Sequence, residues 1–146
     1  MNKLMKKEAS RLEKAQGLVE FAVSIVIVLI LLAGVLDLGR ALFTFITLRD
    51  AAQEGAIYGS INPTDYTNIE SRVRNSTNTP VDLTDTTNIQ VSSTVIGSAC
   101  AGNGIQITVT YPNFSLTTPF LGSILGSQTI PIRATVTDTI LRPPCQ

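Results

Sequence analysis

One apolar run near the N-terminus constrains the fold of this chain more than any other feature. Residues 18–36 read LVEFAVSIVIVLILLAGVL, and the last 16 of them, from Phe21 on, contain no charge and no proline. A helix rises about 1.5 Å per residue, so a bilayer core of about 30 Å needs roughly 20 apolar residues. A chain of 146 residues could hardly bury a helix that is apolar on every side. The run therefore predicts a membrane-spanning helix over residues 18–38.

Charge is distributed unevenly around this run, although the chain has 11 basic and 11 acidic residues in total. Every lysine precedes the run and none follows it. The basic residues before it outnumber the acidic ones, with Lys3, Lys6, Lys7, Arg11 and Lys14 against Glu8 and Glu13. Positive charge beside a span favours the cytoplasmic side. We therefore expect a basic cytoplasmic leader at residues 1–15, a single pass through the inner (cytoplasmic) membrane, and a C-terminal domain outside.

The residues after the run continue a helical pattern. Apolar side chains recur there at spacings of three and four, which marks one face of a helix: Leu38, Leu42, Phe45, Leu48, Ala52 and Ala56. A secretory signal peptide has a shorter apolar region of about 7–15 residues, followed by a cleavage site. We expect one helix over residues 16–60, about 65 Å long at 1.5 Å per residue. Asn62 precedes Pro63, which ends the helix.

Small residues gather at the end of this helix, namely Ala51, Ala52, Gly55, Ala56 and Gly59. Residues without bulky side chains let another backbone approach closely. Two neighbours fit this pattern: a sheet formed by the same chain, or a helix of another copy. The sequence leaves both open.

Residues 61–146 predict a β-rich domain. Asp65–Asn75 should form a short helix capped by Thr64, and the turn-forming residues 76–88 a loop. Pro131 places the last strand at an edge or a bulge. Apolar and polar side chains alternate in a way that indicates a half-buried antiparallel sheet of three strands, at residues 89–96, 104–111 and 130–140. The predicted fold class is α+β: a long N-terminal transmembrane helix followed by a small antiparallel β-sheet domain.

Two stretches of this domain have unusual surfaces. Residues 113–126 contain six apolar residues that either fold over the sheet as a loop with a helical turn or form an exposed patch for a neighbouring subunit: Phe114, Leu116, Phe120, Leu121, Ile124 and Leu125. Residues 91–132 contain no charged side chain at all. An ordinary soluble surface carries far more charge. The stretch suits a domain that touches its own kind, and also any secreted domain of low charge.

The two cysteines lie in the predicted external domain. Cys100 and Cys145 predict a disulfide there, with two free thiols as the alternative. The chain contains no histidine, so a metal site on two cysteines is disfavoured and no serine or cysteine has a histidine base. No phosphate-binding loop and no basic stripe for nucleic acid is present. We therefore expect neither catalysis, nor a cofactor, nor a nucleic-acid partner.

Three blocks of the sequence resemble TadE-like proteins, which are pilin-like proteins of the tight-adherence branch of the type IV pilus superfamily. The blocks occur in the order and at the spacing of the family: QGLVEFA at residues 16–22, DLGRALF at 37–43 and AAQEGA at 51–56. The resemblance covers residues 14–59 and carries Glu20, an acidic residue near the edge of the span that needs a partner or a role there. It implies a pilin-like fold.

The resemblance also implies processing by a prepilin peptidase, which cuts on the cytoplasmic side and leaves the helix attached. The matching bond is Ala15–Gln16, where the family usually has glycine before the cut. Cleavage at Gly17–Leu18 and no cleavage are the alternatives. In pilins the glutamate is thought to pair with the N-terminal amine of a neighbouring subunit, a role that falls to Glu20 here; without cleavage, Lys14 or a lipid headgroup would have to serve.

Two classes of function remain. The first is a structural subunit of a tight-adherence pilus, with other copies or related pilins, the prepilin peptidase and the pilus assembly platform as partners. The second is a single-pass membrane-anchored domain that binds a ligand or a surface without polymerising. Glu20 and the basic leader favour the first, in which the subunit moves from the membrane into an extracellular filament.

Overall fold

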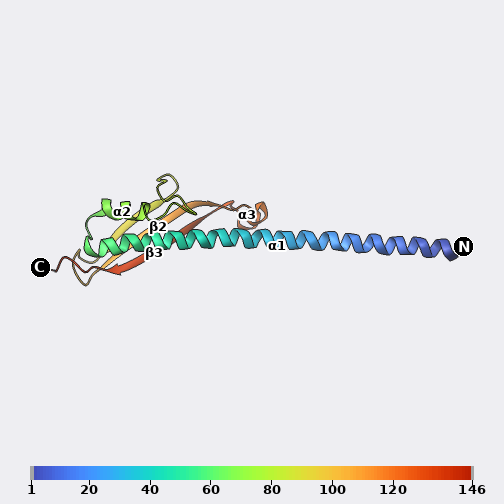
Figure 1. Ribbon diagram of the computed structural model, residues 1–146, viewed down its shortest axis with the longest axis horizontal. Helices are drawn as coiled ribbons and strands as arrows, with labels where there is room; N and C mark the ends of the chain where they lie inside the picture. The colour runs from blue at the N-terminus through green and yellow to red at the C-terminus, as the bar shows by residue number, and fades with distance from the viewer. Residues whose placement is uncertain (1, 146) are drawn as a thin grey trace. The chain divides into compact units, whose positions relative to one another are not determined.

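The computed structural model describes residues 2–145, and the side chains of all of these except residues 2–15 and 119–121. Its elements in chain order are α1 (Asn2–Ile61), α2 (Tyr66–Arg74), β1 (Gln90–Ile96), β2 (Gly104–Ser115), α3 (Pro119–Leu125) and β3 (Thr129–Thr139) (Figure 1). The chain divides into two units, with the boundary after Asp37. The architecture is α+β, as the sequence predicted.

The first unit consists of the N-terminal part of α1. The predicted helix is confirmed, but it begins at Asn2 rather than near Gln16 and ends at Ile61. The leader contains neither glycine nor proline before Gly17 and is rich in lysine, glutamate, leucine and alanine. These residues have high helix propensity, so the helix extends back through the leader. Asn62 and Pro63 follow its last residue, as expected.

The second unit is built on a three-stranded antiparallel sheet in the order β1-β2-β3. Val91 pairs with Val109, which pairs with Ala134, and the three side chains share one face. All three expected strands form, although β2 runs four residues further than predicted. A register shift between Tyr111 and Phe114 lets β2 pass through Pro112 and pair again with β3. β3 is an edge strand, which suits Pro131.

The inner face of the sheet packs on the second half of α1 and on α2. Every second side chain of a strand points to the same face of the sheet, so the alternating apolar residues of the three strands all lie on the inner face and form a hydrophobic core. In Figure 1 the sheet lies alongside the green part of α1. The largest core side chains are Leu48 from α1, Ile69 and Val73 from α2, Leu83 and Ile89 from the loop before β1, Ile105, Ile107 and Val109 from β2, and Ile140 after β3. The compact unit therefore includes the outer half of the long helix, and not only the residues after 60.

Two details differ from the sequence prediction. The N-cap of α2 is Asp65 and not Thr64, because the Asp65 carboxylate accepts a hydrogen bond of 3.3 Å from the backbone N–H of Asn68. For residues 113–126 the sequence left two possibilities open, a loop that covers the sheet and an exposed apolar patch, and the structure shows some of each. Phe114 and Leu116 are buried in the core, whereas Ile124 and Leu125 on α3 are exposed. The side chains of residues 120 and 121 lie outside the described part of the chain.

Candidate functional site

The apolar part of α1 presents its side chains outward. From Gln16 to Leu36 every side chain is exposed except Ala33 and Gly34, which are half-buried. Phe21 is 67% exposed and Leu31 is 65% exposed. Exposure of so much apolar surface to water is unfavourable, because burial of apolar area is the main favourable term in folding. By length and composition, the described helix from Gln16 to Ile61 contains a stretch that is long and apolar enough to cross a membrane.

The residues singled out for processing lie at the start of this segment. Gln16, Gly17, Leu18 and Glu20 are all exposed on α1, and the Ala15 side chain lies outside the described residues. One helical turn separates Gln16 from Glu20. Two ion pairs among the described side chains, Arg72–Glu54 and Arg74–Glu70, do not include Glu20. The structure thus presents Glu20 on the surface of the apolar segment, where a partner outside this chain can reach it.

The small residues at the end of α1 contact the sheet and α2 of the same chain. A Cβ added to Gly55 would lie 2.5 Å from Cγ2 of Val73 and 3.4 Å from Cγ2 of Ile107. A Cβ added to Gly59 would lie 2.7 Å from Cδ1 of Ile105. Ala51, Ala52 and Ala56 are fully buried. The sequence allowed either a sheet of the same chain or a helix of another copy on this face of α1. The structure shows that the sheet of the same chain packs there, together with α2.

A polar cluster joins α1 to α2 outside the core. The Tyr58 hydroxyl donates to Oδ2 of Asp65 at 2.9 Å, and the Asn68 amide donates to the same oxygen at 2.7 Å. The hydrogen bonds from Asn68 and then Tyr58 lower the pKa of Asp65, and the bond to Asp65 raises the pKa of Tyr58. Arg72 lies 5.4 Å from the centroid of the Tyr58 ring. No sequence pattern pointed to this cluster.

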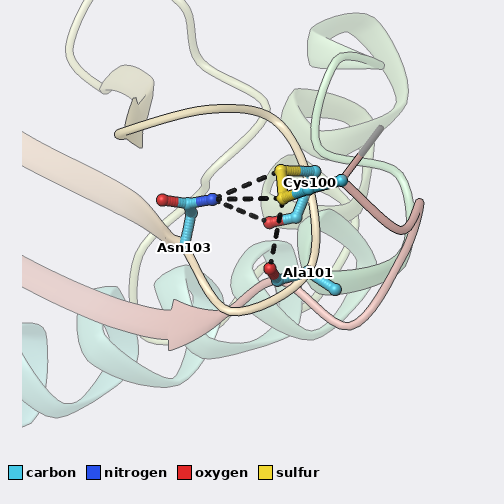
Figure 2. Close-up of a disulfide and its surroundings, with 4 residues drawn as sticks. Cys100, Ala101 and Asn103 are labelled. Carbon is cyan, nitrogen blue, oxygen red and sulfur yellow. Dashed lines mark hydrogen bonds between the residues drawn. A yellow bond between two sulfur atoms is a disulfide. The ribbon is translucent and has the colours of Figure 1, made fainter.

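The predicted cysteine pair lies at disulfide distance. Cys100, in the loop between β1 and β2, is joined to Cys145, and their Cα atoms are 5.0 Å apart. Figure 2 shows the Asn103 amide pointing at the sulfurs, and it donates to the Cys100 carbonyl at 3.2 Å. The C-terminal segment also caps α1, because the Leu141 N–H donates to the Ser60 carbonyl at 2.7 Å. The bridge thus fixes the segment that closes the end of the long helix.

One cation near the apolar segment is held by the β domain. Nη1 of Arg40 donates a hydrogen bond to Oγ1 of Thr117, which lies just before α3. The guanidinium also stands over the Phe114 ring, 5.4 Å from its centroid. Sequence analysis did not find this contact, since Arg40 and Thr117 are 77 residues apart. Within the described residues no group of three or more acidic, cysteine or histidine side chains suits a metal ion.

Comparison with known protein families finds a match over the segment that contains Glu20 and most of the outer half of α1. Residues 15–56 match the family model of TadE-like proteins. The TadE-like match agrees with the three blocks recognised in the sequence and covers the span and most of the outer half of α1. It indicates a protein associated with the Tad pilus, with pilus-related partners in general. No curated protein and no solved structure matches this chain.

Proposed function

We propose that this chain is a pilin-like structural subunit of a Tad pilus, which acts by assembly and not by catalysis. The observation that carries the proposal is the exposed apolar surface of α1 in a segment that matches the TadE-like family. In a membrane, lipid covers this surface. In a filament, other copies of the chain cover it, so the same segment serves first as anchor and then as the core of the polymer.

Once the chain has left the lipid, hydrophobic burial holds the assembled helices together. Full burial of one valine, leucine or isoleucine side chain stabilises by roughly 1.5–3 kcal/mol. The exposed run from Leu18 to Leu36 offers more than ten such side chains to its neighbours. Small residues within the run, Ala22, Ser24, Ala33 and Gly34, allow close approach of neighbouring helices. Outside lipid, a bundle of such helices would therefore be held mainly by the hydrophobic effect.

Glu20 sets the axial position of each copy in the bundle. A carboxylate left unpaired among apolar side chains costs several kcal/mol, so registers that pair it are strongly preferred. Cleavage between Ala15 and Gln16 would create an N-terminal amine one helical turn before Glu20, where a neighbouring copy's carboxylate can reach it. If the leader stays attached, Lys14 or a lipid headgroup takes the place of the amine.

Orientation follows from the leader. The five basic residues before the span keep the N-terminus in the cytoplasm, where a prepilin peptidase acts, and place the β domain and its disulfide outside. A pilus assembly platform in the membrane would then extract the chain. Uncharged side chains on the outer face of the sheet, such as Thr94, Gln106 and Thr108, would face neighbouring subunits.

The experiment introduces a charge into the apolar segment. Val26→Arg or Ile30→Glu should abolish filaments, whereas the volume-conserving Ile30→Leu should leave them intact. Glu20→Ala should also abolish filaments while the protein still reaches the membrane and forms its disulfide. The disulfide and the thermal unfolding of the β domain report that each variant has folded. Filaments of normal yield from Val26→Arg and Glu20→Ala would refute assembly through α1 and favour a membrane-anchored binding domain.

A further inference from the structure

A cleft of about 560 Å³ opens beside the first residues of the second unit. We call it the aromatic cleft, because three of the eight aromatic residues of the chain line it: Phe43 on α1 and Tyr111 and Phe114 on β2. Tyr111 and Phe114 meet edge to face, with ring centroids 6.0 Å apart. The volume falls within the range of small-molecule sites, about 300–1,000 Å³.

Both basic and acidic side chains line the aromatic cleft. Arg40 is held by Thr117 and the Phe114 ring. The loop before β1 contributes Asp82 and Asp85 to the lining of the cleft. One oxygen of Asp82 accepts hydrogen bonds from the Thr84 N–H at 3.0 Å and the Thr84 hydroxyl at 2.7 Å, which orients an otherwise exposed carboxylate. The cleft therefore combines a guanidinium, aromatic rings and two carboxylates, a set that complements a ligand with both a cationic and an anionic group.

The level of the cleft along α1 points to the source of such a ligand. Arg40 and Phe43 follow Leu38, the expected end of the span, by two and five residues, a rise of about 3 and 7.5 Å. The headgroup layer on each side of a bilayer is about 5–7 Å thick. On this part of α1 the apolar side chains of Leu42 and Phe43 are exposed, and those of Ile124 and Leu125 on α3 are exposed as well. The Arg40–Thr117 hydrogen bond holds the start of α3 at this level.

We propose that the aromatic cleft binds the headgroup of a zwitterionic phospholipid. The ammonium lies among the aromatic rings and the carboxylates of Asp82 and Asp85, and the phosphate lies toward Arg40. The proposal rests on the membrane span alone and not on assembly into a filament. A soluble glycan would also suit aromatic rings and carboxylates. The exposed apolar side chains of Leu42 and Phe43, on the part of α1 that carries the cleft, favour the lipid, because they would lie in water around a soluble ligand.

The test measures which lipids stay with the full-length protein. The chain is reconstituted in nanodiscs of equal parts phosphatidylethanolamine and phosphatidylglycerol, and the lipids retained on it are identified by native mass spectrometry. We expect phosphatidylethanolamine to be enriched about fivefold, the size of one cation–π contact. Phe43→Ala and Asp82→Asn should bring the ratio close to that of the bulk lipid. Both residues are exposed and outside the core, so these variants should fold.

Matched controls come from the same helix. Phe45→Ala removes an exposed phenylalanine that does not line the cleft, and Asp50→Asn removes an exposed carboxylate outside it. Both should retain the fivefold enrichment. Equal retention of the two lipids by the wild-type protein, or an equal loss in Phe45→Ala and Phe43→Ala, would overturn the proposal. Binding of soluble sugars that depends on Phe43 and Asp82, without lipid enrichment, would overturn it in favour of a glycan.

Discussion

The contact between α1 and α2 at Gly55 allows a quantitative test of how the helix is held. Gly55→Ala adds one methyl group at a point where Cγ2 of Val73 lies only 2.5 Å from the new atom. Val73 is a β-branched residue in a helix and has essentially one side-chain rotamer, so it cannot turn aside. The two helices, or the sheet behind them, must move apart instead.

Two opposing effects decide the size of the change. Alanine is about 1 kcal/mol better than glycine in a helix. Overpacking of a well-packed core costs typically about 1–3 kcal/mol, and a clash this short belongs at the upper end. The expected net loss is therefore about 2 kcal/mol. For a unit of about 110 residues this lowers the unfolding midpoint by roughly 5–10 °C.

Gly39→Ala is the matched control, because an added Cβ at Gly39 has nothing within 4 Å. It carries the same gain in helix propensity without the clash, so its midpoint should rise slightly. Both variants are measured as full-length protein in detergent by thermal unfolding, followed by near-ultraviolet circular dichroism of the tyrosines. If Gly55→Ala is as stable as Gly39→Ala, α1 does not pack on α2 and the sheet as described.

Three further predictions test other parts of the molecule. Cys100→Ser should lower the free energy of unfolding by about 4 kcal/mol, because the two bridged cysteines are 45 residues apart in sequence. The wild-type protein with reductant should show the same loss of thermal stability, and an unchanged midpoint would exclude the bridge. Protease added to spheroplasts should digest the β domain and spare the N-terminal leader, and the reverse pattern would contradict the orientation. The lowered pKa of Asp65 gives stability that is present above about pH 4 and lost as the pH falls further. Asp65→Asn should therefore flatten the acid limb of a plot of unfolding midpoint against pH, and an unchanged limb would show that its hydrogen bonds do not contribute.

Much of this fold could be predicted from the sequence because its signals are local. The apolar run, the alternation in residues 104–111 and 130–140, and the turn-forming residues before β1 each indicate an element without reference to the rest of the chain. The family resemblance likewise rests on contiguous blocks, and the match over residues 15–56 confirms it. The two cysteines were informative because only one pairing exists.

The remainder depends on contacts between residues distant in sequence. The small residues of α1 fit a sheet or another helix equally well, and only the approach of Val73 and Ile107 to Gly55 decides between them. Arg40 looks like an ordinary surface charge until Phe114 and Thr117 are placed beside it. The N-cap of α2 was missed because Thr64 and Asp65 are both good capping residues and only the backbone shows which one is used. The roles of Ala15, Gln16 and Glu20 concern other molecules and stay predictions.

The central claim is that copies of this chain assemble through the apolar segment of α1. Site-specific photo-crosslinking in cells tests it most directly, with the reactive amino acid placed in turn at Val23, Ile27 and Ile30, and at Gln53 on the outer half of α1 as a comparison. The account predicts adducts of two and more copies from the three apolar positions, and their loss when Glu20→Ala is added. Single-copy products from every position, together with a monomeric purified protein in detergent, would contradict it.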